Sequence, residues 1–251
     1  MIPATKINQL LQDLPFGSVL LSGWLNEQGY SFSLQQSYRR SGWLVSIGKG
    51  AMVRAGHKLI LAGSINALQQ QAGLDLHIGG RTALGLLGYA HYLEINRSQT
   101  LLFTGRSTHI PAWLESNSWD SSPMVIRTSF IPRETGLQDI DMNGITVRIS
   151  TPVRAYLECL FLAPDRFDLT EAWEIMQGLN TLQPGEVRQL LMQCKSVKVK
   201  RLFLFLAGKA GHNWFSKLDI GEIDLGKGKR RLVKNGIYNA RYQITLPENL
   251  A

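Results

Sequence analysis

Residues 17–56 decide the fold, and they read GSVLLSGWLNEQGYSFSLQQSYRRSGWLVSIGKGAMVRAG. Apolar residues at positions 19, 20, 21, 24 and 25 fall mostly on one face of a helix, which Gly29 can end. Ser33 and Gln36 have the spacing of a capping box, which predicts a second helix over residues 34–41. The beginning of the stretch therefore predicts two short helices joined by a turn.

A β-hairpin is expected directly after the second helix. The apolar residues 43–45 and 51–53 flank a glycine-containing turn at 47–50. Helix, turn, helix and hairpin is the order of a winged helix-turn-helix, a module that binds DNA. The alternative is a helical hairpin that carries a surface β-ribbon. We call residues 3–58 the reading head.

Side-chain chemistry favours the winged helix-turn-helix. If Leu34 and Tyr38 point inward, the opposite face of the second helix carries Gln and Arg, which contact base edges and phosphates. The hairpin adds basic residues suited to phosphate contact. The sequence thus predicts a DNA-binding set of Gln35, Gln36, Ser37, Arg39, Arg40, Lys49 and Arg54.

Charge is unevenly distributed along the 251 residues, whose formal net charge is +8. Residues 1–63 hold six basic and two acidic residues, residues 64–191 hold nine and thirteen, and residues 192–251 hold twelve and four. Two basic ends fit a nucleic-acid footprint, although a solvated surface would look the same in sequence. The second basic segment is expected to contribute Lys198, Lys200, Arg201, Lys227, Lys229, Arg230 and Arg231.

No catalytic, metal or membrane signature accompanies this charge pattern. Cys159 and Cys194 have no partner at metal-ligand spacing, and the sequence predicts neither a metal site nor a cofactor. The beginning of the chain does not resemble a signal peptide and no apolar run approaches a membrane span, so we expect a cytoplasmic protein with no membrane partner. His91 as a base, and Glu222 with Asp224 as metal-dependent nuclease residues, are the alternatives. We expect a protein that is not an enzyme.

The rest of the chain predicts an α+β protein. Helices are expected over residues 59–74 and 82–89 and again after Pro152, and strands over residues 100–104, 125–131 and 145–149. Asn143 and Gly144 form a strong hairpin signal. We expect two domains: residues 1–94 comprise the reading head and the helices after it, and residues 95–251 form a second, mixed α/β domain.

Taken in order, several motifs resemble the AbiEi antitoxins of bacterial type IV toxin–antitoxin systems. The resemblance covers about residues 3–247 and rests on the set as a whole. The motifs are YRRSGWL at 38–44, IGKG at 47–50, HIGGRTAL at 77–84, GYAHY at 88–92, STPVRA at 150–155, SVKVKRLFL at 196–204 and DLGKGKR at 224–230.

The resemblance implies a fold, a function and two partners. AbiEi proteins have an N-terminal winged helix-turn-helix and a C-terminal antitoxin domain, and they repress their own operon by binding inverted repeats in promoter DNA. They counteract a co-encoded AbiEii toxin, which looks like a nucleotidyltransferase, without a stable complex, and such pairs can confer phage resistance by abortive infection. The alternative functions are a nuclease or toxin-modifying enzyme in the C-terminal domain, or an RNA-binding module.

Overall fold

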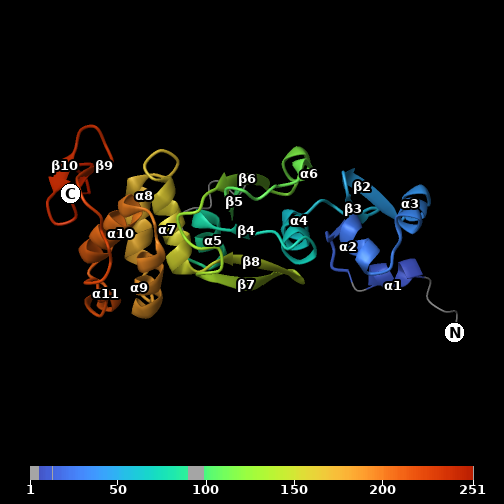
Figure 1. Cartoon of the computed structure of the whole chain (residues 1–251), viewed down its shortest axis with the longest axis horizontal. Coiled ribbons are helices and arrows are strands. Elements are labelled where there is room, and N and C mark those ends of the chain that lie inside the picture. The colour runs from blue at the N-terminus through green and yellow to red at the C-terminus, as the bar shows by residue number, and fades with distance from the viewer. Residues whose placement is uncertain (1–5, 13, 90–98, 251) are drawn as a thin grey trace. The chain divides into compact units, whose positions relative to one another are not determined.

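The computed structural model describes residues 6–12, 14–89 and 99–250. Two compact units are interleaved along the chain (Figure 1). The first contains residues 1–78, 96–127 and 139–149, and the second contains residues 79–95, 128–138 and 150–251. The expected domain boundary at residues 94 and 95 falls outside the described residues and stays a prediction.

The reading head, blue in Figure 1, folds as a winged helix-turn-helix, as predicted. Its elements are α1 (Lys6–Gln12), β1 (Val19–Leu21), α2 (Ser22–Glu27), α3 (Phe32–Arg40), β2 (Leu44–Gly48) and β3 (Ala51–Arg54). The strands form an antiparallel sheet in the order β1-β3-β2. The helices close over this sheet through a small core that includes Leu20, Leu25, Tyr38 and Met52.

The predicted first helix is wrong in its first half. Residues 19–21 form strand β1, and the helix begins only at Ser22. Leu20 pairs with Met52 of β3, so the apolar run is buried by a strand that lies about thirty residues later in the chain. The predicted end of the helix is confirmed, since α2 stops at Glu27 and Gly29 adopts a φ of +82°.

The beginning of α3 also differs from the prediction. The N-cap is Ser31, whose side chain accepts a hydrogen bond from the Leu34 amide at 3.3 Å. Ser33 lies inside the helix, where its hydroxyl is within hydrogen-bonding distance of the Ser31 hydroxyl. The helix therefore starts two residues earlier than the capping-box pattern predicts.

A five-stranded sheet follows the reading head, in the order β6-β5-β4-β8-β7. Its strands are β4 (Leu76–Ile78), β5 (Gln99–Thr104), β6 (Ser122–Arg127), β7 (Leu137–Met142) and β8 (Ile145–Ser150). The central strand β4 pairs antiparallel with β5 and parallel with β8. Asn143 and Gly144 both have positive φ, at 57° and 83°, as the turn between β7 and β8 requires.

Short helices lie between the wing and β4, and between β5 and β6, in the first unit. They are α4 (Leu61–Asn66), a π-helical turn η1 (Ala67–Gln71) and α6 (Ala112–Ser116). Gly63 in α4 lies against the Gly17 carbonyl so closely that any Cβ would overlap the oxygen. Glycine is therefore required where α4 approaches the chain just before β1.

The second unit is mostly helical. It contains α5 (Gly80–Leu86), α7 (Pro152–Leu162), α8 (Leu169–Gly178), α9 (Pro184–Gln193), α10 (Val197–Ala210) and α11 (Asn213–Ser216). A small sheet, ordered β10-β11-β9, ends the chain with β9 (Arg230–Arg231), β10 (Ile237–Asn239) and β11 (Ile244–Leu246). Tyr156 of α7 and Phe203 of α10 are fully buried, with ring centroids 5.8 Å apart.

A buried ion pair fixes the start of α7. Arg154 Nε donates to Glu158 Oε1 at 2.9 Å, and the two side chains are 7% and 1% exposed. Arg154 also donates to the Pro132, Arg133 and Thr135 carbonyls, while Glu158 accepts from the Gly80 amide and the Ser150 hydroxyl. These hydrogen bonds satisfy the charges that burial would otherwise leave unpaired.

In the part of the chain that the structure describes, no helix combines the length and the apolar character needed to cross a bilayer.

Candidate nucleic-acid interface

Helix α3 presents an exposed face of polar and basic side chains. Gln36, Ser37, Arg39 and Arg40 are all exposed, whereas Tyr38 is 9% exposed and packs into the core of the reading head. Burial raises the pKa of the Tyr38 hydroxyl, and the nearby Tyr30 raises it further. The helix is anchored on one side and leaves the side chains of Gln36, Arg39 and Arg40 exposed on the other.

Gln35 does not belong to this exposed face, and its predicted outward position is wrong. Its side chain is fully buried. Its Oε1 accepts from the Ser22 hydroxyl at 2.5 Å, and its Nε2 donates to the Ser22 carbonyl at 3.0 Å and the Tyr30 carbonyl at 2.7 Å. Gln35 therefore links α3 to the first residue of α2 and to the turn between the helices.

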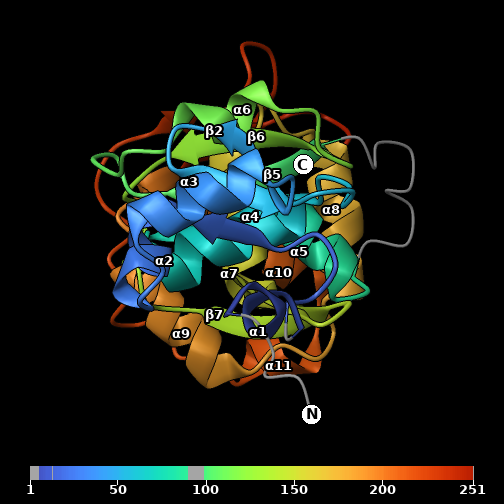
Figure 2. The same ribbon diagram turned by 90° about the vertical axis from the view of Figure 1, so that its right-hand side faces the viewer.

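The wing is the hairpin of β2 and β3, and it lies beside α3 in both views (Figures 1 and 2). Lys49 lies in its turn and Arg54 ends β3, and both are exposed. Arg39 of α3 reaches toward β3, where its Nη1 lies 3.2 Å from Met52 Sδ. The structure thus brings the basic residues of the wing and the exposed face of α3 into one module.

Two residues far along the chain support the wing, and no sequence motif singles them out. Trp113 of α6 is 4% exposed and packs on Gly48, where a Cβ would overlap the Trp113 Cβ. Asn117 donates from Nδ2 to the Ile47 carbonyl at 2.8 Å. The tip of β2 is therefore held by the segment around α6, which is also in the first unit.

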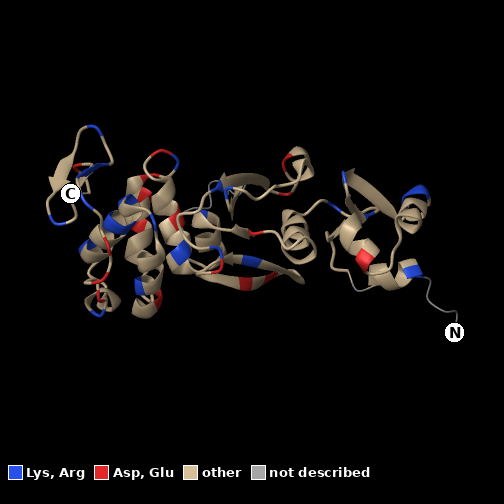
Figure 3. Cartoon of the chain, viewed as in Figure 1, with Lys and Arg blue, Asp and Glu red and all other residues tan. Residues whose placement is uncertain are grey.

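Positive charge predominates at the exposed parts of the reading head (Figure 3). Blue marks the end of α3 and the wing, and red marks α2, where Glu27 lies. His57 follows the wing, and burial lowers the pKa of its imidazole, with the charge of Arg54 adding to the effect. A neutral His57 suits its contact with the Gly17 amide, which donates to Nδ1 at 3.3 Å.

The second predicted basic set separates into two groups, and part of the prediction is wrong. Lys200 and Arg201 are only 5% and 2% exposed. The Arg201 guanidinium donates to the carbonyls of Leu225, Gly226, Gly228 and Gln243 at 2.6–3.2 Å, so it stabilises the loop and strand of the terminal sheet. An arginine in this position cannot reach a phosphate.

Lys198 is half-buried and donates to the carbonyls of Phe161 and Ala163. Burial lowers the pKa of its amine, and Asp165 opposes this shift. The remaining predicted residues, Lys227, Lys229, Arg230 and Arg231, are exposed on the terminal sheet and its loop. Lys229 Nζ lies 5.0 Å from the Tyr238 ring centroid.

The alternative catalytic residues are not assembled into a site within residues 6–12, 14–89 and 99–250. Glu222 pairs with Arg188, and Asp224 Oδ1 accepts from the Gly226 amide at 2.7 Å as part of a turn. His91 lies outside the described residues. No group of three or more His, Cys, Asp or Glu suited to a metal occurs in the described chain. Burial raises the thiol pKa of both Cys159 and Cys194.

The fold and the exposed face define a winged helix-turn-helix protein. The profile of the AbiEi antitoxin N-terminal domain of transcriptional regulators matches residues 3–95, and that of the transcriptional regulator AbiEi antitoxin of type IV toxin–antitoxin systems matches residues 97–247. The chain belongs to the AbiEi family of transcriptional regulator antitoxins of type IV toxin–antitoxin systems.

A solved structure supports the fold. The RV2827C protein from Mycobacterium tuberculosis matches with a TM-score of 0.57 at 15% sequence identity, over 95% of this chain and 88% of that one. At this identity the likeness concerns the fold alone. No curated protein matches the chain in sequence.

Proposed function

We propose that this antitoxin represses its own operon by binding inverted repeats in promoter DNA through α3 and the wing. The observation that carries the proposal is the set of exposed polar and basic side chains on α3, next to a basic wing. Gln36, Arg39 and Arg40 have the chemistry that reads base edges in the major groove. Lys49 and Arg54 supply cations for the neighbouring phosphates.

The internal contacts of the module support this assignment. A recognition helix must keep its register while its side chains contact base edges. Gln35 and Tyr38 fix α3 to α2 and to the core, and Trp113 fixes the tip of the wing. Arg39 contacts the core residue Met52, and the other residues assigned to DNA are separate from those that hold the module together.

The test is the affinity of the full chain for its own promoter fragment, measured by fluorescence anisotropy at several salt concentrations. Arg39→Ala and Arg40→Ala should each weaken specific binding by about 1–3 kcal/mol if they contact bases. Lys49→Ala should weaken specific and non-specific DNA alike and reduce the slope of log K against log[salt] by about 1. Lys217→Ala, an exposed lysine of the second unit, is the control.

Unchanged promoter affinity in all three reading-head variants would exclude this surface. A loss of the same size in Lys217→Ala would show that only net charge matters.

The family also implies a toxin as the functional partner. We propose that the chain counteracts a co-encoded, nucleotidyltransferase-like toxin in the cytoplasm without forming a stable complex, and that it is not itself an enzyme. Co-expression with the downstream gene tests the first part, since growth should be restored by the antitoxin. Size-exclusion chromatography of the mixed proteins tests whether a stable complex forms, and a co-eluting complex would contradict the proposal that it does not.

A further inference from the structure

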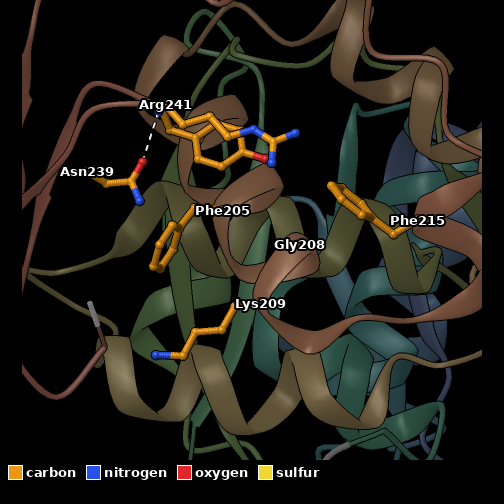
Figure 4. A pocket seen from close by; sticks show the side chains of 7 residues that line it. Phe205, Gly208, Lys209, Phe215, Asn239 and Arg241 are labelled. Atoms are coloured by element: carbon orange, nitrogen blue, oxygen red, sulfur yellow. Dashed lines mark hydrogen bonds between the residues drawn. The ribbon is translucent and has the colours of Figure 1, made fainter.

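Phe32, the first residue of α3, is the most exposed of the large apolar side chains that the structure describes, at 61%. Phe205 beside α10 is more typical of the chain, since it is buried and meets the Tyr242 ring with centroids 6.3 Å apart (Figure 4). Phe16 is also exposed, but its ring centroid lies 4.4 Å from that of His57. Within the described residues, the Phe32 ring has no such ring contact. The packing of the fold therefore does not account for an aromatic residue at this position.

Helix α3 is held in place by residues other than Phe32. The hydroxyl of the N-cap residue Ser31 accepts a hydrogen bond from the Leu34 amide. Gln35 and Tyr38 are buried, and Leu34 packs against the core of the reading head. These residues define the inner side of the helix, and Phe32 lies outside it, in solvent.

Phe32 shares a line along α3 with two of the residues assigned to DNA. Gln36 and Arg39 follow it four and seven residues later, and this spacing brings side chains onto one strip of a helix. Both are exposed, as Phe32 is. The strip presents a ring, an amide and a guanidinium in succession, with the ring in the first turn. Recognition helices contact base edges through residues of their N-terminal part, so the ring lies where such contacts are made.

The other side chains of this surface favour DNA over a protein as its occupant. Helix α3 contains no acidic residue, and its remaining exposed residues are polar or basic: Ser33, Gln36, Ser37, Arg39 and Arg40. An apolar protein surface would leave these groups without hydrogen-bond partners, whereas base edges and phosphates can satisfy them. A partner that offers a small apolar group among many acceptors therefore fits best.

We propose that Phe32 contacts the C5-methyl group of a thymine in the major groove, and so selects an A·T pair at one position of the binding site. This inference rests on the proposed binding of α3 to promoter DNA. The thymine methyl is the apolar group that base edges present in the major groove, and Phe is among the side chains that contact it. Gln36, one turn further along α3, carries the donor and acceptor that match an adenine edge.

Removing the methyl groups from the DNA tests the proposal directly. Fluorescence anisotropy compares binding of the full chain to its promoter fragment and to the same fragment with uracil in place of every thymine, which keeps the hydrogen-bonding edges. Burying a methyl group is worth about 0.8 kcal/mol, so the wild type should bind uracil DNA about fourfold more weakly for each methyl contacted by Phe32. Phe32→Ala should lose this difference and bind the thymine fragment as weakly as the wild type binds the uracil fragment.

Two variants serve as controls. Phe16→Ala removes an exposed phenylalanine of the reading head outside α3, and it should keep the full preference for thymine. Arg39→Ala should bind both fragments more weakly and retain the ratio between their affinities. Because the Phe32 ring is exposed, Phe32→Ala should keep the thermal midpoint of the wild type in circular dichroism.

Single uracil substitutions then locate the contact. One thymine position in each repeat should weaken wild-type binding about fourfold when its methyl is removed, and the same substitution should not affect Phe32→Ala. Equal effects on the two proteins at every position would contradict a contact between Phe32 and a methyl group.

Two further results would overturn the inference: equal affinity of the wild type for thymine and uracil DNA, or full promoter affinity of Phe32→Ala. If Arg39→Ala still weakens promoter binding in either case, the proposed function stands and only the role of Phe32 is refuted. If Arg39→Ala and Arg40→Ala also bind the promoter as the wild type does, both proposals fail together.

Discussion

Gln35 and Ser22 are joined by two hydrogen bonds, one in each direction, across the turn of the helix-turn-helix. The Ser22 hydroxyl donates to Gln35 Oε1 at 2.5 Å, and Gln35 Nε2 donates to the Ser22 carbonyl at 3.0 Å. A buried amide that is satisfied on both sides fixes a single arrangement of its two helices. The angle at which α3 meets a partner depends on this pair.

Replacing Gln35 should therefore destabilise the reading head. Gln35→Met keeps the length of the side chain but removes its hydrogen bonds to the Ser22 hydroxyl and to the Ser22 and Tyr30 carbonyls, so we expect a loss of about 1–3 kcal/mol in the free energy of unfolding. Gln36→Met is the control, because an exposed substitution should change stability by less than about 0.5 kcal/mol. Urea denaturation measures both. Equal stability of the two variants would contradict the structural role of Gln35.

The buried ion pair between Arg154 and Glu158 leads to a second prediction. Arg154→Met leaves Glu158 buried without its cation and should cost about 3–5 kcal/mol in the free energy of unfolding. Arg148→Met removes an exposed pair with Asp139, whose side chains are 42% and 49% exposed, and should cost about 0–1 kcal/mol. Adding Glu158→Leu to Arg154→Met should recover part of the loss. A similar loss of unfolding free energy in Arg154→Met and Arg148→Met would refute the expected difference between the buried and the exposed ion pair.

Arg201 should act on the terminal sheet. Arg201→Met removes the donor to four carbonyls, and the loop and strands they belong to should open more often as a result. Hydrogen–deuterium exchange over residues 223–246 should become faster, while exchange in α8 should not change. Lys229→Met, an exposed change in the same segment, should leave the exchange of residues 223–246 as in the wild type. Unaltered exchange in Arg201→Met would show that these hydrogen bonds are dispensable.

Truncation tests where the chain can be divided. A fragment of residues 95–251 lacks β4, the central strand of the sheet, and α5, whose Gly80 amide binds Glu158 at 2.9 Å. We expect this fragment to lose cooperative thermal unfolding, whereas a fragment of residues 60–251 retains it, as followed by circular dichroism. A cooperative transition of the shorter fragment at the temperature of the longer one would contradict this view and favour the boundary near residue 95.

Local signals in the sequence were the ones that predicted the structure well. Asn143 with Gly144 specifies a hairpin because both residues accept positive φ, and Pro152 suits the first position of a helix. The wing was predicted correctly for the same reason, since a glycine turn between two apolar runs is recognisable without knowledge of the rest of the fold.

Signals that depend on distant contacts failed. Periodicity cannot show that residues 19–21 pair with a later strand, so they resembled the start of a helix. In the sequence, a polar residue on a buried helix face cannot be distinguished from an exposed polar residue. For this reason Gln35 was predicted to contact DNA. Arg201 was assigned to a basic surface for a similar reason, because charge alone does not reveal four carbonyls that converge on one guanidinium.

The contact of Trp113 with Gly48 limits how this protein can be recombined with its relatives. A chimera that exchanges only residues 1–58 would place a foreign wing on the native tryptophan and on Asn117, and the two surfaces would have to match by chance. If α3 and the wing bind operator DNA as proposed, transplanting that specificity requires moving the segment around α6 together with the reading head. The part of the chain that folds together with the wing is discontinuous in sequence.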